Sequence, residues 1–491
     1  MSINDIVRAA VVKTNDHWPF SRLNRIPYHL AIGALLQLCK NFPQIRSVYL
    51  RHGLLEDDWV PAISDIDLTL VIRGQLPPEE EFSFLQSFWQ AHDRLKKLFP
   101  MLRDIDILDE EHVGSWTRFT IRGYESSRWR LLYGVQTVKS EYVPAPMRIT
   151  VDALNYGLLF YLDCFLPKFY TEERENSVYL HELQRLTRKL SRLAHYSTSS
   201  DRRSLETDPP LRDKSDLLAW LVKALDEGMR YVAPAGRITS SANGARQWSD
   251  DVEAAASVDQ VWDLQVPAVV AKAIDGVLRL DDRHIVVLRD DLDVSVIRSC
   301  ADVVRRVFHQ RRSGPVIVSG RLFEHMVRSY DPFLYARLAT SRKLAYGRDV
   351  LPTIEPPDRC AFIGKVLGHL PSALAFPQKR PVIYPPGLAW LDGRGPEWLL
   401  EGALFFQLYL ETGSVGRRRE ALVAETRERY GASYRRLRDI REQAQHAGTT
   451  AVAGDFFRLF KDLARDVHSQ LADSAGLEDC LVRPWGTGTQ G

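Results

Sequence analysis

The sequence predicts an α+β protein in which a small mixed sheet is followed by a helical region. Residues 45–110 contain three apolar runs of strand length and, between them, a longer run with apolar residues at helical spacing. Residues after 258 repeat this order in part, which favours an internal duplication with a degenerate second copy. Since any two α/β segments resemble each other to some degree, chance similarity is the alternative interpretation, and the sequence leaves both open.

The elements of the first half follow from apolar spacing and turn residues. The predicted strands are 47–50, 65–72 and 103–108. The predicted helices are 5–40, 77–99, part of 110–134 and two within 151–195. The helix at 77–99 opens with Pro-Pro and three glutamates, which suit the N-terminal turn of a helix.

The second half repeats several of these features. Strands are predicted at 284–288 and 315–319, and helices at 291–310 and 321–329. Two pairs of short segments are also alike, Arg130–Gly134 with Lys343–Gly347 and Gly157–Tyr161 with Gly402–Phe406. Polar stretches at 197–215 and 233–257 are typical of exposed connections. The predicted domains are 1–145, a helical domain at 146–232, a degenerate second α/β unit at 258–350 and a C-terminal helical region at 380–491.

The composition is that of a globular protein. The 491 residues include 65 Lys and Arg against 63 Asp and Glu, and this near-balance excludes a chain that is a polycation throughout. The five cysteines are scattered and form no C-x-x-C pair, which argues against a zinc site and a disulfide framework and fits a reducing compartment. The longest apolar stretch, 153–165, is shorter than the roughly 20 residues of a membrane span. We therefore expect a cytoplasmic protein with no membrane partner.

Chemistry is indicated by two carboxylates at the start of a predicted strand. Because side chains alternate between the faces of a strand, Asp65 and Asp67 share one face while Ile66 enters the core. Cα atoms two residues apart on a strand are about 6.6 Å apart, and carboxylates held that close repel each other unless a cation neutralises them. Divalent metals do so in two-metal sites. A second pair, Asp104 and Asp106, lies on the next predicted strand and offers a third carboxylate.

These residues resemble a known family. Gly53, then eleven residues ending in Ser64, then Asp65-Ile66-Asp67 leading into an apolar strand, are similar to the motif of the nucleotidyltransferase superfamily typified by DNA polymerase β. The closer similarity is to the minimal and aminoglycoside-type nucleotidyltransferases, and it covers roughly residues 45–110.

The resemblance implies a catalytic domain in residues 1–145 and assigns roles to single residues. Gly53, with Arg51 and Ser64, would contact the nucleotide. The metal ligands would be Asp65, Asp67 and Asp106, with Asp104 as the alternative third acid. Two Mg²⁺ ions would then support transfer of a nucleoside monophosphate from ATP, or another nucleoside triphosphate, to a hydroxyl of an unidentified small-molecule or macromolecular acceptor.

A second hypothesis is a catalytically weak or inactive nucleotidyltransferase-like protein that binds a nucleotide or a partner. Leu54 follows the glycine where the family has a small residue, and the loop 55–58 is acidic, so a triphosphate would meet fewer donors and more negative charge. The simpler interpretation of all four aspartates is an acidic surface. An arginine-rich segment, 417–441, could bind RNA, but interleaved acids favour a solvated helix.

Overall fold

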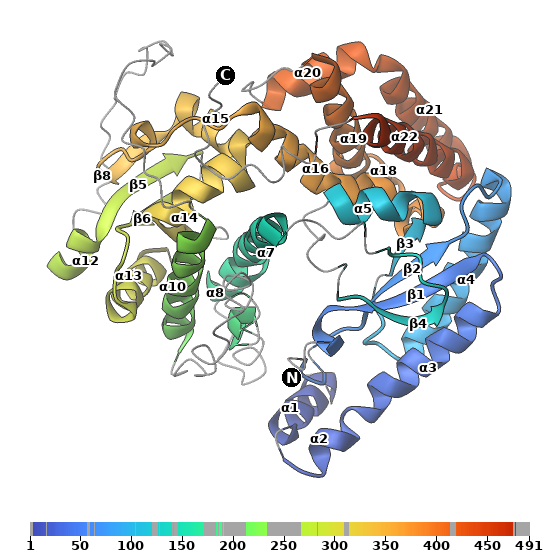
Figure 1. Cartoon of the computed structure of the whole chain (residues 1–491), viewed down its shortest axis with the longest axis horizontal. Coiled ribbons are helices and arrows are strands. Elements are labelled where there is room, and N and C mark those ends of the chain that lie inside the picture. The colour runs from blue at the N-terminus through green and yellow to red at the C-terminus, as the bar shows by residue number, and fades with distance from the viewer. Residues whose placement is uncertain are drawn as a thin grey trace. The chain divides into compact units, whose positions relative to one another are not determined.

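A computed structural model of the chain describes most of its length and divides it into two compact units. The described residues are 3–15, 17–55, 59–62, 64–103, 105–119, 126, 128–139, 141, 146–170, 183–184, 186–188, 190, 213–232, 267–281, 283–308, 314–412, 419–474 and 477. The first unit combines residues 1–144 with 366–415 and 419–478, and the second unit is built from residues 145–365 with short pieces of the C-terminal region. Each unit contains one sheet (Figure 1).

The sheet of the first unit has four strands in the order β3-β2-β1-β4. Its strands are β1 (Ile45–Arg51), β2 (Asp67–Ile72), β3 (Asp106–Asp109) and β4 (Arg130–Gly134). β1 runs antiparallel to both β2 and β4, whereas β3 runs parallel to β2. The central strands are buried on both faces, as the run Leu68 to Ile72 illustrates.

Helices from both ends of the chain complete this unit. The N-terminal helices are α1 (Ile3–Thr14), α2 (Phe20–Leu23), α3 (Ile26–Lys40), α4 (Pro78–Leu98) and α5 (Val113–Phe119). The C-terminal helices are α17 (Arg380–Ile383), α18 (Leu388–Leu391), α19 (Arg394–Thr412), α20 (Arg419–Arg429), α21 (Gly431–Ala447) and α22 (Ala453–Asp473), and α16 (Arg359–Ala375) spans the boundary between the units. α22 packs against α4 and α5. It buries Phe456, Phe460, Leu463 and Val467, which recur at the spacing of one helix face.

The second unit contains a sheet of the same topology. Its strands β5 (Ile274–Leu280), β6 (Arg283–Leu288), β7 (Val316–Ser319) and β8 (Lys343–Gly347) lie in the order β7-β6-β5-β8. Its helices are α7 (Pro146–Phe160), α8 (Leu166–Tyr170), α10 (Lys214–Val232), α12 (Ala268–Ala273), α13 (Val294–Phe308), α14 (Gly320–His325) and α15 (Pro332–Ser341), with π-helical turns at Tyr161–Phe165 and Met326–Tyr330. α10 packs against α13 and α14, as α22 packs against α4 and α5 in the first unit.

The predicted α+β class is confirmed, but three strands were not predicted. Residues 110–134 were expected to form a helix and a connection, and they also contain the edge strand β4. β4 is short and only half-buried, so its residues show little of the apolar alternation that marks a strand. β5 and β8 were missed as well, and the helix predicted within 110–134 corresponds to η2 (Glu110–His112) and α5.

One helical stretch is longer and more apolar than the sequence pattern suggested. Residues Ile149–Tyr170 form a continuous helical run that could cross a membrane by length and composition alone. More than half of its apolar window is buried inside the protein, as in the core helix of a globular unit.

Candidate functional site

Three of the predicted site residues, Arg51, Asp67 and Asp106, lie on one face of the first sheet. Arg51 of β1 lies directly opposite Asp67 of β2, and Thr69 of β2 lies opposite Asp106 of β3. Residues directly opposite on neighbouring strands, and residues two apart on one strand, point to the same face. This face therefore carries one cation and two carboxylates across three adjacent strands.

Asp106 is neutralised by two cations of the chain itself. Its carboxylate lies 2.8 Å from the guanidinium of Arg51 and 3.0 Å from the ammonium of Lys379. Arg51 is 3% exposed, and its guanidinium lies 5.9 Å from the ring centroids of both Trp116 and Trp129. Because Asp106 is itself only 8% exposed, these contacts hold it in a buried ion pair where the two-metal hypothesis expects a metal ligand.

The other predicted residues lie where β1 ends and β2 begins. Gly53 is part of the 3₁₀ turn η1 (His52–Leu55), which follows β1 directly. Asp65 is part-exposed and lies 3.4 Å from the guanidinium of Arg103. The Ser64 hydroxyl is buried and accepts a hydrogen bond of 2.8 Å from the backbone N–H of Val60, so it helps to shape the turn before β2. Asp104 lies outside the described residues.

A second cluster, which the sequence did not single out as a site, lies at the other end of β3. Asp109, the last residue of β3, accepts hydrogen bonds from the ammonium of Lys461 at 2.6 Å and from the amide of Gln378 at 3.1 Å. The same ammonium donates to Glu81 of α4 at 2.8 Å. The three charged side chains are at most 4% exposed. We call Glu81, Asp109, Gln378 and Lys461 the buried ion network.

The buried ion network shifts the pKa values of its members. Burial raises the pKa of Glu81 to about 7, and nearby Asp109 adds to the increase. Burial also acts to raise the pKa of Asp109, but His112 and Lys461 more than offset it and bring that pKa below its usual value. Burial acts to lower the pKa of Lys461, yet the two carboxylates raise it. Lys461 and Asp109 are therefore charged at neutral pH, and Glu81 titrates there.

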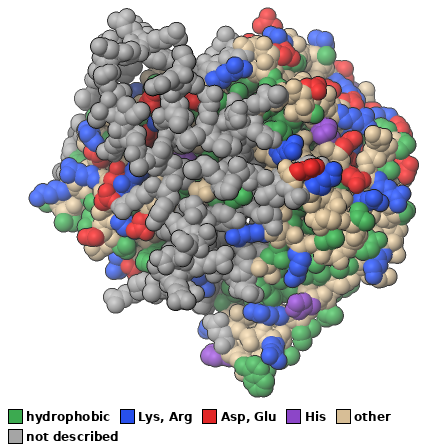
Figure 2. Space-filling model, viewed as in Figure 1, with side chains coloured by type: hydrophobic (Ala, Val, Ile, Leu, Met, Phe, Trp, Pro, Cys, Tyr) green, Lys and Arg blue, Asp and Glu red, His purple; other side chains and the backbone are tan. Residues whose placement is uncertain are grey.

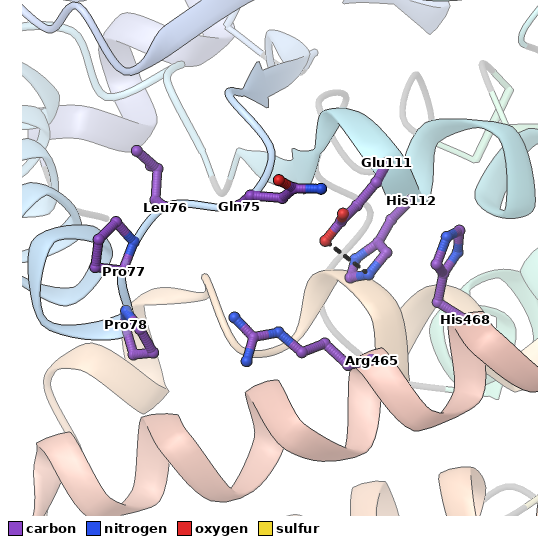
Figure 3. Close-up of a pocket in the computed structure, with 8 residues that line it drawn as sticks. All are labelled: Gln75, Leu76, Pro77, Pro78, Glu111, His112, Arg465 and His468. Carbon is purple, nitrogen blue, oxygen red and sulfur yellow. Dashed lines mark ion pairs between the residues drawn. The ribbon is translucent and has the colours of Figure 1, made fainter.

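A cavity of about 460 Å³ adjoins this network. Eight residues from the start of α4, from η2 and from α22 line it: Gln75, Leu76, Pro77, Pro78, Glu111, His112, Arg465 and His468 (Figure 3). Figure 3 shows Glu111, His112 and His468 together at one end and Arg465 along its floor.

Two histidines at this end come from distant parts of the chain. The Nδ1 atom of His112 lies 3.0 Å from Asp109, and its Nε2 atom lies 3.9 Å from Glu111. The ring centroid of His468 on α22 is 4.7 Å from that of His112, and its Nδ1 atom is 3.0 Å from the Ser115 hydroxyl. Asp109, Glu111 and His112 bring three potential ligand atoms within 4.8 Å of one another, and no other such group occurs among the described residues. The predicted trio of Asp65, Asp67 and Asp106 is not gathered in this way.

The sequence contained only part of the signal for this second cluster. Asp109 and the glutamates after it read as an acidic surface, because nothing local shows that a lysine more than 350 residues away neutralises them. The available hint was an acid directly after the predicted strand 103–108, followed at once by Glu-Glu-His.

The arginines of the C-terminal helices are largely engaged with acids. Arg429 pairs with Glu411, and Arg436 with Asp462, at 2.6 and 2.7 Å. On the face drawn in Figure 2, cationic and acidic side chains of the described residues are interspersed. RNA binding by residues 417–441 stays a prediction, and these pairs favour the solvated-helix interpretation.

Comparisons with known proteins identify no family for this chain. No family model, no curated protein and no solved structure matches the chain.

Proposed function

We propose that the first unit is nucleotidyltransferase-like and binds a nucleoside triphosphate with little or no transfer activity. The observation that carries this proposal is the state of Asp106, which is buried and paired with both Arg51 and Lys379. A carboxylate in that position must release two cations before it can bind a metal, and separating buried ion pairs costs several kcal/mol. The arrangement supports a site in which Arg51 and Lys379 neutralise Asp106, as Mg²⁺ would do in an active enzyme.

The cations around the face can also bind phosphate. Lys379 is about one-third exposed and Arg103 two-thirds exposed, so both ammonium and guanidinium groups can reach a polyanion at the surface. The turn containing Gly53 opens at the same edge of the sheet, where β1 ends and β2 begins. Lysine and arginine are the usual phosphate ligands in such sites.

Active Mg²⁺-dependent nucleotidyl transfer from ATP is the second candidate function. It is favoured by Asp65 and Asp67, which flank Ile66 where β2 begins and are both part-exposed. These two carboxylates could hold one metal ion together with the phosphates of the nucleotide. Full two-metal catalysis would require Asp106, or Asp104, as a further ligand.

Calorimetry with ATP, with and without Mg²⁺, separates the two candidates. The binding proposal predicts saturable ATP binding that persists in EDTA, survives Asp65→Ala with Asp67→Ala, and weakens in Lys379→Ala with Arg103→Ala. A matched control is Lys272→Ala with Arg279→Ala, which changes the same charge on the second unit. Binding that requires both Mg²⁺ and the two aspartates, with label transferred from radioactive ATP to an acceptor, would instead establish the enzyme. Absence of ATP binding under all conditions would refute both.

We further propose that the two units arose by internal duplication. The two sheets share strand order and orientation, and each has a register shift near the start of its first strand, between Ile45 and Ser47 and between Ile274 and Gly276. The edge strands β4 and β8 both end in a glycine with positive φ, Gly134 and Gly347. In the matching registers, Arg283 stands where the first sheet has Asp67 and Val316 where it has Asp106, which supports a second copy without the acids.

A further inference from the structure

The cavity beside η2 is lined by donors that suit a transition metal better than magnesium. Glu111 and His112 lie next to each other in sequence, and His468 joins them from α22 (Figure 3). Imidazole nitrogen is a preferred ligand of zinc and its neighbours in the first transition series, whereas Mg²⁺ prefers oxygen alone. This donor set therefore differs in kind from the carboxylates proposed for nucleotide binding.

His112 is the feature that needs an explanation. It is 0% exposed and its Nε2 atom makes no hydrogen bond, while its Nδ1 atom lies 3.0 Å from the Asp109 carboxylate. A buried polar group without a hydrogen bond costs about 1–3 kcal/mol. A metal ion on Nε2, with Nδ1 turned to donate to Asp109, would satisfy both nitrogens, which is the usual arrangement of a carboxylate, a histidine and a metal.

The side chains around His112 are oriented in a way that suits metal binding. The Asp109 carboxylate is fixed by a hydrogen bond of 2.6 Å from Lys461 and lies 3.0 Å from the Nδ1 atom of His112, so it can orient the His112 ring as a positioning residue. The Nδ1 atom of His468 is held by Ser115, which leaves its Nε2 atom as the remaining donor.

Charge in the cluster also favours a divalent cation. Glu81, Asp109 and Glu111 supply three carboxyl groups, against two cations: Lys461, which pairs with the two buried carboxyl groups, and Arg465, which lines the cavity. Glu111 faces the cavity with an exposed side chain and contacts His112 only at 3.9 Å. The second unit offers an internal comparison, because the residues in register with Asp109 and its followers are Ser319, Gly320, Arg321 and Leu322, which include no metal donor pair.

We propose that Glu111 and His112 bind one divalent transition-metal ion of the zinc class at this end of the cavity, with Asp109 positioning the His112 ring. The ring of His468 lies 4.7 Å from that of His112 but outside the group of mutually close donor atoms, so His468 would complete the site after a turn of its side chain. The remaining coordination positions would open into the cavity, whose volume of about 460 Å³ is sufficient for water and a small ligand. The site lies at the far end of β3 from Asp106, about 10 Å along the strand, so it is distinct from the proposed nucleotide site.

Zinc binding by untagged, EDTA-stripped full-length protein tests the proposal. Competition against a chromophoric chelator should show one equivalent of Zn²⁺, and the Co²⁺ form should show visible absorption bands of a site with nitrogen ligands. Glu111→Gln, His112→Gln and His468→Gln should each weaken zinc binding at least tenfold, and Asp109→Asn should weaken it about tenfold through the ring that it orients. His446→Gln, an exposed histidine on α21, is the matched control and should bind zinc as the wild type does.

Each outcome bears on the proposal. Since His112 is buried and its variant could fail to fold, Glu111→Gln decides the question, because its side chain is exposed. Wild-type zinc affinity in folded Glu111→Gln, or no saturable zinc binding in the wild type, would overturn the site. Asp65→Ala with Asp67→Ala should leave zinc binding unchanged, so failure of the ATP-binding proposal and failure of this one can be told apart.

Discussion

Lys461→Met should be among the most destabilising single substitutions in the first unit. The Lys461 ammonium lies 2.6 Å from Asp109 and 2.8 Å from Glu81, and all three side chains are at most 4% exposed. Methionine matches the length and apolar character of the lysine stem but leaves two carboxyl groups facing each other without a cation. The loss therefore tests whether the buried ion network holds α22 against α4 and β3.

The expected cost follows from the contacts that remain. Removing one partner of a buried ion pair costs about 3–5 kcal/mol, because the other charge is left uncompensated. Gln378 still donates to both carboxyl groups, at 3.2 and 3.1 Å, and hydrogen bonds to charged groups are worth about 1.5–3 kcal/mol each. Glu81 can also take up a proton, since its pKa is already about 7. We therefore expect the lower end of the range, about 3 kcal/mol at pH 8.

Urea unfolding followed by tryptophan fluorescence and circular dichroism measures this loss. Arg436→Met is the matched control, because it breaks an ion pair of similar length, 2.7 Å to Asp462, whose side chains are 42% and 53% exposed. An exposed pair contributes about 0–1 kcal/mol. The loss of unfolding free energy caused by Lys461→Met should be smaller at pH 5, where the carboxyl groups can take up protons. A loss no greater than that of Arg436→Met at pH 8 would refute the reasoning.

Three further substitutions test the first unit. Because burial raises the pKa of Glu81 from 4.5 to about 7, its bound proton stabilises the fold fully below pH 4.5, and this stabilisation is lost as the pH rises through 7. The urea midpoint of the wild type should therefore fall between pH 5 and pH 8, and Glu81→Gln should flatten this decline. Gly134→Ala should lower the melting temperature by an amount equivalent to about 1 kcal/mol or more, because Gly134 has a φ of +86° and a Cβ there would meet the Arg46 carbonyl. Gly33→Ala, in α3 with open space around it, should be neutral or stabilising by up to about 1 kcal/mol.

Local pattern was sufficient for most of the elements and insufficient for the site. β2 and α4 could be predicted because their apolar residues repeat at strand and helix spacing over their whole length. β4 could not, since an edge strand of five residues with half-buried side chains lacks that periodicity. The class of the fold therefore followed from the sequence, whereas the full strand order required the structure.

The predicted acids illustrate the limit for function. The Asp65 and Asp67 pattern correctly indicated two carboxylates where β2 begins, and Asp106 does follow on the neighbouring parallel strand. Nothing near Asp106 in the sequence shows that Lys379 will neutralise it from the other end of the chain. Charge compensation depends on long-range contacts, so residues that look like metal ligands in sequence can be ion-paired in the fold.

The helices α22 and α10, which pack in the first and the second unit, carry side chains of opposite charge toward the sheets of their units. In the first unit α22 brings the cation Lys461 to Asp109 at the end of β3. In the second unit α10 brings an acid, Asp226, which is 3% exposed and accepts hydrogen bonds from Ser319 at the end of β7, at 2.6 Å, and from Arg321 at 2.7 Å. Apolar faces alone would not distinguish the two helices, since both bury leucine or phenylalanine at helical spacing.

Because the two helices carry opposite charges at this position, each sheet packs more favourably with its own helix than with the other. If α10 packed on the first sheet, Asp226 would be buried near Asp109 and Glu81, and if α22 packed on the second, Lys461 would meet Arg321. Burying like charges against each other costs several kcal/mol, and because both helices offer an apolar face, this cost is what distinguishes them. The sheet of residues 45–134 therefore packs with helices that begin beyond residue 365, although residues 146–232 follow it directly in the chain.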